Sequence, residues 1–141
     1  MVRLAEIDDA EQLAALNDEF NGKGETSLEH IRESLRGNPQ EVVVVDEEDG
    51  VLTGFICVQL KRSFCYDECM PEITEVYVRP AYRRQGVARR MLAFAEARCR
   101  AICPCRELTL LTGQDNRAAQ AVYAALGYAA DGEIHLVKEM K

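Results

Sequence analysis

Residues 72–90 read E-I-T-E-V-Y-V-R-P-A-Y-R-R-Q-G-V-A-R-R, and this stretch decides the fold. Residues 73–78 are rich in β-branched and aromatic side chains and stop at Arg79-Pro80, which predicts a strand. Apolar residues at 88, 91, 95, 99 and 102 then form the stripe of a buried helical face. The stretch therefore predicts a strand, a loop and a helix.

The loop between this strand and this helix has the composition of an anion site. A helix N-terminus offers unpaired backbone N–H groups and a partial positive charge, and Gly86 and Ala88 are small enough for phosphate oxygens to approach. Residues 79–106 hold eight arginines against the single acid Glu96. The P-loop and dinucleotide glycine motifs are both absent. We predict a pyrophosphate cradle of another kind, with a solvated basic loop as the alternative.

The rest of the chain predicts a mixed α/β domain with the order β α α β β β α β α β β. The expected strands cover residues 2–7, 41–46, 51–60, 73–78, 108–112 and 128–140, the last as one or two strands. The expected helices cover residues 8–21, 27–36, 88–102 and 116–126. We expect a central sheet of about six or seven strands flanked by about four helices, in a single domain over 1–141.

Composition and charge exclude several classes of protein. The longest uncharged run has 13 residues, 118–130, which is too short for a membrane span of about 20. Acids at positions 6, 8, 9 and 11 interrupt any export signal, so we expect a cytoplasmic protein. A net charge of -7 argues against a nucleic-acid binder. The charge is uneven, because residues 1–70 carry -10 and residues 71–141 carry +3.

Six cysteines stand at positions 57, 65, 69, 99, 103 and 105. Without an export signal, reduced thiols are favoured over a disulfide framework. Four of the thiols could in principle bind zinc, but their spacing is not that of usual zinc knuckles and no histidine is near. We expect no metal and keep a cysteine-based metal or redox protein as an alternative.

Two motifs resemble the GCN5-related N-acetyltransferases (GNAT family). R-R-Q-G-V-A at 83–88 is similar to the family signature Q/R-x-x-G-x-G/A, in which many members have Gly where this chain has Ala88. Residues 108–128, L-T-L-L-T-G-Q-D-N-R-A-A-Q-A-V-Y-A-A-L-G-Y, resemble the family's later strand, Asn-led helix and closing L-G-Y/F. Residues 1–70 match in element order only. The resemblance implies a GNAT-like fold and an acetyltransferase.

The resemblance also implies acetyl-CoA as cosubstrate. Backbone N–H groups of residues 84–89 would bind its pyrophosphate, the arginines at 83 and 84 would add charge, and the pantetheine arm would pair with the strand edge at 76–78. Asn116 would hydrogen-bond the arm or support the site. The implied contact residues are Val76, Tyr77, Val78, Arg83, Arg84, Gln85, Gly86, Val87, Ala88, Arg89 and Asn116.

The implied reaction needs a base and an acid. An amine is mostly protonated at neutral pH, so a carboxylate must take its proton. Glu75 and Glu72 are the candidates, and either could accept the proton through water. The alternative for Glu75 is an outward-facing strand residue without a role in the reaction. Tyr123 matches the tyrosine with which the family protonates the departing thiolate. Some members instead place a glutamate on the fifth strand, where this chain has Leu111.

The acidic first half favours a cationic acceptor, because carboxylates concentrate amines. We expect a small-molecule primary amine that resembles an aminoglycoside or a polyamine, acetylated by direct attack in a ternary complex. Residues 21–25 and 65–70 are the expected walls of the acceptor site. A protein N-terminus or lysine as acceptor, and a non-catalytic CoA-binding sensor, stay open as alternatives. Homodimers are common in the family, and the sequence does not decide this.

Overall fold

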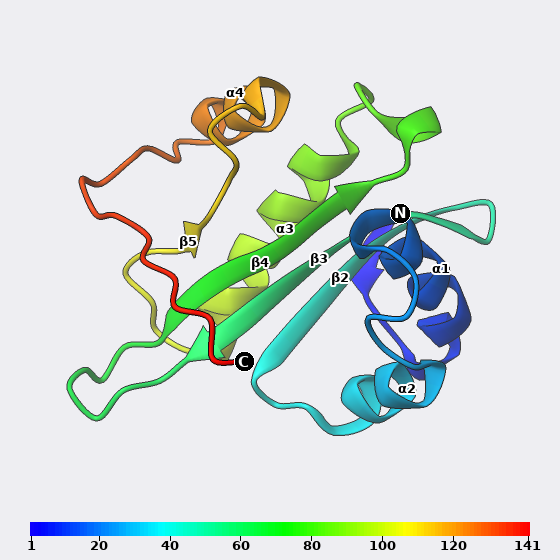
Figure 1. The fold of residues 1–141 in the computed structure, drawn as a ribbon, viewed down its shortest axis with the longest axis horizontal. Coiled ribbons are helices and arrows are strands. Elements are labelled where there is room, and N and C mark those ends of the chain that lie inside the picture. Colours follow the sequence, from blue (N-terminus) through cyan, green and yellow to red (C-terminus); the bar gives the residue numbers. More distant parts are fainter. The chain divides into compact units, whose positions relative to one another are not determined.

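The β-branched runs of the sequence form one five-stranded mixed sheet in the order β1-β2-β3-β4-β5. The computed structural model describes residues 1–141, in two compact units, 1–111 and 112–141. The strands are β1 (Val2–Leu4), β2 (Glu41–Glu48), β3 (Val51–Lys61), β4 (Met70–Val78) and β5 (Thr109–Leu110). The strands β1 to β4 pair antiparallel, and β5 runs parallel to β4. All five belong to the first unit. Figure 1 shows the long strands β2, β3 and β4 side by side.

The helices begin and end at the residues that cap them. They are α1 (Ala10–Asn21), which follows the 3-10 turn η1 (Ile7–Asp9), α2 (Leu28–Gly37), α3 (Val87–Ile102) and α4 (Arg117–Ala125), with a second 3-10 turn, η2 (Pro80–Tyr82), before α3. Ser27 Oγ accepts the His30 N–H at 3.0 Å and so caps α2. Gly22, with a φ of 93°, ends α1. The predicted helices are confirmed to within a few residues.

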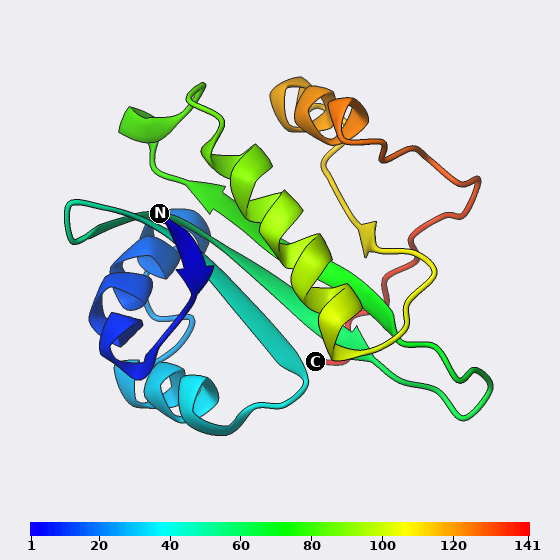
Figure 2. The same cartoon turned by 180° about the vertical axis from the view of Figure 1, so that it is seen from behind.

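The two faces of the sheet are covered by different helices. Helix α3 lies across one face (Figure 2), and a Cβ added to Gly54 in β3 would lie 3.1 Å from the Met91 side chain on α3. On the opposite face, Leu13 and Leu16 of α1 pack in one buried cluster with β-strand residues that include Phe55 and Tyr77. Successive side chains of each strand point to opposite faces of the sheet, so each strand contributes to both halves of the core.

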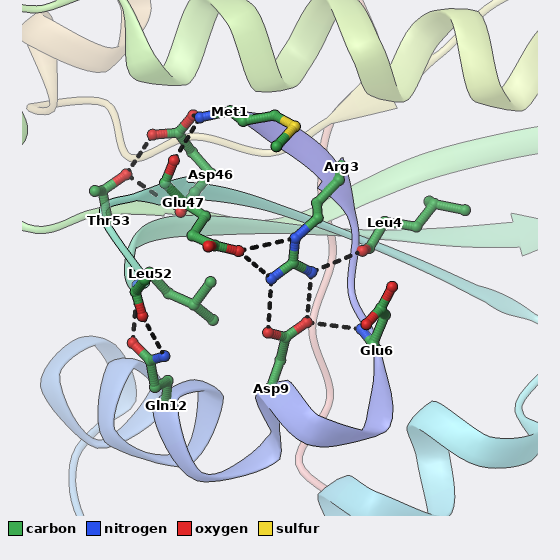
Figure 3. Close-up of polar contacts among 11 residues, drawn as sticks. Met1, Arg3, Leu4, Glu6, Asp9, Gln12, Asp46, Glu47, Leu52 and Thr53 are labelled. Carbon is green, nitrogen blue, oxygen red and sulfur yellow. Dashed lines mark hydrogen bonds and ion pairs between the residues drawn. The ribbon is translucent and has the colours of Figure 1, made fainter.

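An ion-pair network fixes the first strand to the first helix (Figure 3). The Arg3 guanidinium donates to both carboxylate oxygens of Asp9, at 2.7 and 2.9 Å, and its Nε donates to Glu47 at 3.0 Å. The Asp9 side chain also accepts the Glu6 N–H at 2.7 Å. Hydrogen bonds from Arg3 lower the pKa of Asp9 below its usual value. The network holds β1 and the start of α1 on the edge of β2.

The second unit contains α4 and an irregular segment. The Asn116 side chain accepts the Ala119 N–H at 3.2 Å and caps α4, and Gly127, with a φ of 95°, follows its end. No strand forms after residue 127. None of the four helices has the length and apolar composition to cross a bilayer.

The prediction of one or two closing strands over 128–140 is wrong, and the sheet has five strands where six or seven were expected. Ile134 and Leu136 alternate with polar residues, as in a half-buried strand, but they are 79% and 82% exposed. Their side chains therefore do not pack on a core. A strand needs the edge of a neighbouring strand, and β5 has only two residues where five were predicted over 108–112. The prediction of a single domain over 1–141 stays a prediction.

Candidate active site

The turn before α3 exposes the first backbone N–H groups of that helix. Gly86 is the N-cap residue with a φ of 77°, and Arg84 also has a positive φ, 62°. The Arg90 N–H donates to the Gly86 carbonyl at 3.0 Å and makes the first helical hydrogen bond. The N–H groups of residues 87–89 precede this bond and have no partner within the helix. They form the positive end of the helix dipole.

Side-chain contacts fix the shape of this turn. Arg83 Nε donates to the Val78 carbonyl at 2.8 Å, and Arg90 Nη1 donates to the Gln85 carbonyl at 2.8 Å. Gln85 Nε2 donates to the Ala81 carbonyl at 3.2 Å. Because Arg90 crosses the turn, a Cβ added to Gly86 would lie 3.1 Å from Arg90 Nη1. The turn therefore favours glycine twice, by its backbone angle and by the space beside it.

Two arginines of this turn are available to an anion. The side chains of Arg84 and Arg89 are exposed and make no ion pair. The Arg83 guanidinium also lies 5.7 Å from the centre of the Tyr77 ring, so it is already held in place. Unpaired N–H groups, a glycine turn and free guanidinium groups match the chemistry of a diphosphate.

Strands β4 and β5 separate after two residues. They pair only at Glu72–Thr109 and Ile73–Leu110, whereas β4 pairs with β3 as far as Val78. Along residues 74–78, β4 therefore has a neighbouring strand on one side only. An unpaired strand edge can take an extended chain by backbone hydrogen bonding. Val76 is half-buried in this stretch, whereas Tyr77 and Val78 are each 9% exposed.

A bulge in β4 places both candidate bases on one face of the sheet. Glu75 pairs with Cys57, and Glu72 pairs with Gln59. The two glutamates are three residues apart in β4, whereas their partners are only two residues apart in β3. Thr74 is thus the extra residue in β4. Residues two apart in a strand share a face, so Cys57 and Gln59 lie on the same side of β3. Their partners Glu75 and Glu72 therefore lie on that side too. Without the bulge, a spacing of three would put them on opposite sides.

The surroundings of the two glutamates differ. Glu72 forms an ion pair with Lys61, at 3.1 Å. Glu75 forms no ion pair; it accepts hydrogen bonds from the Thr74 hydroxyl and from the Cys57 thiol. The Glu75 carboxylate is therefore not paired with a cation of the chain.

The negative charge of Glu75 acts on its neighbours. Burial, followed by the charge of Glu75, raises the pKa of Glu41. Burial and the charges of Glu41 and Glu75 raise the pKa of the Cys57 thiol well above its ordinary value. This region of the sheet therefore favours a cation over a further anion.

Sequence reasoning missed Glu19, which lies in the last turn of α1. The Tyr77 hydroxyl donates to Glu19 at 3.0 Å, and Arg79 Nε lies 3.3 Å from the same carboxylate. The Phe20 ring stacks on Tyr77 with the centres 5.2 Å apart. These contacts join the end of α1 to the end of β4. The available sequence signal was the position of the Glu19 carboxylate close to residues 21–25, the expected wall of the acceptor site.

Asn116 and Tyr123 belong to the second unit. The Asn116 side-chain oxygen is occupied by the cap of α4, which leaves its amide N–H groups as donors. Tyr123 is half-buried, and burial raises the pKa of its hydroxyl, which therefore keeps its proton at neutral pH. Its ring packs edge-on against Tyr128 with the centres 6.1 Å apart. The other predicted site residues all lie in the first unit.

The sequence model of the acetyltransferase (GNAT) family matches residues 7–128. No curated protein matches the chain. Solved structures are similar over its whole length. One is an aminoglycoside acetyltransferase from an uncultured soil metagenomic sample, in complex with trehalose, with 16% identity, a TM-score of 0.85 and coverage of 100% of this chain and 96% of that chain.

Two further structures have similar scores. An aminoglycoside N-acetyltransferase in complex with CoA has 19% identity and a TM-score of 0.82, and each chain is covered completely. A ribosomal-protein-alanine N-acetyltransferase from Brucella melitensis biovar Abortus 2308 has 16% identity and a TM-score of 0.81, with 99% of each chain covered. At these identities the similarity shows the fold.

Proposed function

The chain belongs to the GNAT family of acetyltransferases, and we propose that it moves an acetyl group from acetyl-CoA to a primary amine of a cationic small molecule. The observation that carries the proposal is the free N-terminus of α3, with Gly86 as N-cap, beside a β4 edge that has no partner along residues 74–78. The first feature suits a diphosphate and the second an extended amide chain. CoA contains both.

The predicted contact residues have distinct tasks in this proposal. The N–H groups of Val87, Ala88 and Arg89 bind the diphosphate, and the exposed Arg84 and Arg89 guanidinium groups neutralise its charge. Arg83 and Gln85 hold the turn through their bonds to the Val78 and Ala81 carbonyls. The edge of β4 at 76–78 pairs with the pantetheine arm. The Asn116 amide supplies a further donor to the arm.

The carboxylates prepare the amine. Glu75 takes a proton from the ammonium group, through a bridging water where the distance requires one, and Glu72 is the alternative base. Glu75 is preferred over Glu72 as the base because no cation is paired with Glu75, whereas Glu72 is already paired with Lys61. The amine lone pair then attacks the acetyl carbonyl carbon, while a backbone N–H of β4 stabilises the negative charge on the carbonyl oxygen.

The tyrosine completes the reaction. As the bond between the acetyl carbon and sulfur breaks, the thiolate takes a proton from the Tyr123 hydroxyl, the resulting phenolate takes the second proton of the attacking nitrogen, and the product amide leaves with the acetyl group. The half-buried, protonated hydroxyl of Tyr123 and its position in the Asn-led helix support this role.

The cationic acceptor is supported by the charges around Glu75. Glu41 and Glu75 interact unfavourably with each other, so an ammonium group bound near both carboxylates would relieve their repulsion. Two of the similar structures are aminoglycoside acetyltransferases. A protein N-terminus is the second candidate, favoured by the similar ribosomal-protein-alanine N-acetyltransferase. A cytoplasmic location and a homodimer stay predictions.

A panel of amines tests the proposal. Purified protein is incubated with acetyl-CoA and, separately, an aminoglycoside, spermidine and a peptide that begins with alanine, and acetylated products are identified by mass spectrometry. Thiol reagents are avoided because the chain has six cysteines. Acetylation of the small cations, lost in Glu75→Gln, is expected. Acetylation of the peptide alone would contradict the proposed acceptor, and CoA binding without any acetylation would favour the sensor.

A further inference from the structure

Four cysteines that sequence analysis left without a role gather where α3 ends. Cys69 precedes β4 and forms an isolated parallel bridge with Cys105, and its N–H donates to the Pro104 carbonyl at 2.9 Å. Cys103 caps α3 and donates its N–H to the carbonyl of Cys99, one turn earlier, at 3.1 Å. Three elements of the first unit therefore bring these thiols together.

Two of these thiols touch each other. The Cys69 and Cys103 thiols hydrogen-bond, and their residues are 1% and 7% exposed. Cys69 and its bridge partner Cys105 have Cα atoms about 5 Å apart, within the range that a disulfide spans, and Cys103 lies two residues before Cys105. No three His, Cys, Asp or Glu side chains are arranged to hold a metal ion. The contact is thus between two thiols, which is the arrangement that oxidation requires.

The surrounding contacts hold the segment before β4 against the segment that follows α3. Arg106, just beyond the thiols, forms an ion pair with Glu68 at 2.5 Å. Together with the Cys69–Pro104 hydrogen bond, this pair holds the β3–β4 loop against the segment that follows α3. A covalent bond between the two segments would need only a small movement of the sulfurs.

We propose that Cys69 and Cys103 form an oxidisable dithiol site, which a low-molecular-weight disulfide converts to a protein disulfide by way of Cys105. Cys105 is the half-buried member of the group, whereas Cys69, Cys99 and Cys103 are buried. Burial raises the pKa of Cys69 to about 11, which makes it a poor first nucleophile at neutral pH. The more accessible thiol therefore reacts first.

The reaction consists of three exchanges. The Cys105 thiolate attacks one sulfur of the small disulfide, whose S–S bond breaks and releases one small thiol. Cys69 loses its proton and attacks the Cys105 sulfur, releasing the second small thiol. Cys103 loses its proton and attacks the Cys69 sulfur, and the Cys105 thiolate leaves and regains a proton. In sum, two cysteine thiols are oxidised and one small disulfide is reduced to two thiols.

Oxidised glutathione is the probe, with the folded full-length chain. After incubation the protein is unfolded and its remaining thiols are alkylated, and the intact mass is expected to show that two of the six thiols form an internal disulfide, which is distinguished from a glutathione adduct by the added mass of the adduct. The bond closes the loop 69–103, so Tm should rise by on the order of 10 °C and return on reduction with dithiothreitol. Six remaining thiols after prolonged incubation would overturn the proposal.

Peptide mapping assigns the bond. Cleavage after Tyr66 separates Cys65 from Cys69, and cleavage after Arg100 and Arg106 releases the peptide that holds Cys103 and Cys105. The cross-linked pair should contain Cys69, and a bond through Cys65 would overturn the proposal. The cross-link should persist in the matched control Cys65→Ser, since Cys65 is exposed and lies outside the group.

Variants separate the two thiols of the second peptide. Cys105→Ser, in which Cys103 is the only thiol of that peptide left to pair with Cys69, should keep the cross-link but form it about tenfold more slowly, whereas Cys103→Ser should stop at the Cys69–Cys105 disulfide of the second exchange. Loss of the cross-link in Cys105→Ser, or its formation there at the wild-type rate, would overturn the proposed pairing and route. The peptide map of the wild-type chain decides the question even if a buried variant does not fold, because it distinguishes the internal bond from a glutathione adduct on the exposed Cys65. Acetyl transfer plays no part in these readouts, so the outcome is independent of the proposed function.

Discussion

Replacement of Gly86 by alanine is expected to weaken CoA binding by about 5- to 30-fold. Gly86 has a φ of 77°, a conformation that costs a residue with a Cβ about 1–2 kcal/mol. The added Cβ would also lie 3.1 Å from Arg90 Nη1, which is the end of a flexible side chain and can move aside. If the variant turn relaxes to avoid this strain, CoA must restore it, and 1.4 kcal/mol corresponds to about tenfold in affinity.

Gly50→Ala is the matched control for this change. Gly50 has a φ of 80° in the turn between β2 and β3, and a Cβ there would meet nothing within 4 Å. The backbone strain is the same, but the turn is not part of the proposed CoA site. Gly50→Ala should lose about 1–2 kcal/mol of unfolding free energy and no affinity, whereas in Gly86→Ala, where the free turn relaxes, this energy should be lost from CoA binding.

Calorimetric titration with CoA gives the dissociation constants, and denaturant unfolding gives the free energies. An affinity in Gly86→Ala equal to that of the wild type would refute the role of this turn. An equal loss of affinity in Gly50→Ala would show that general destabilisation, and not the cradle, controls binding.

Three further changes test the base, the acid and the stability of the fold. Glu75→Gln should lower kcat by about 10²- to 10⁴-fold, with partial recovery at high pH, where more of the amine is already neutral; an unaltered pH profile would move the base to Glu72 or to solvent. Tyr123→Phe should lower kcat by about tenfold or more and leave the Kd for CoA unchanged, and wild-type turnover would contradict its role as acid. Because the pKa of Asp9 is lowered by Arg3, the ionised carboxylate stabilises the fold above its ordinary pKa of 3.8, and this contribution is lost as pH falls through the folded-state pKa. Asp9→Asn should therefore lower the unfolding free energy by about 2 kcal/mol at pH 7 and flatten the acid side of its pH dependence, as urea unfolding between pH 2 and pH 7 would show.

The sequence was sufficient for elements whose signals are local. Ser27 caps α2 and Asn116 caps α4, as their positions before apolar periodic runs indicate. The strand, glycine turn and helix around Gly86 were also predictable, because strand composition, Pro80 and helical periodicity all agree there.

Features that depend on partners in space were not predictable. The alternation at Ile134 and Leu136 predicted a strand, but pairing also requires an adjacent edge, and β5 has only two residues. The bulge at Thr74 has no local signature, although it decides that Glu72 and Glu75 share a face. Glu19 meets Tyr77 across 58 positions of the sequence, a contact that only the tertiary fold creates.

The central claim is that backbone N–H groups at the start of α3 bind the diphosphate of CoA. The most direct measurement follows the amide signals of the ¹⁵N-labelled protein during titration with CoA and, separately, with pantetheine, which lacks the diphosphate. We expect the amide signals of Gly86, Val87, Ala88 and Arg89 to shift with CoA and not with pantetheine. Shifts confined to other parts of the chain, or equal shifts with both compounds, would contradict it.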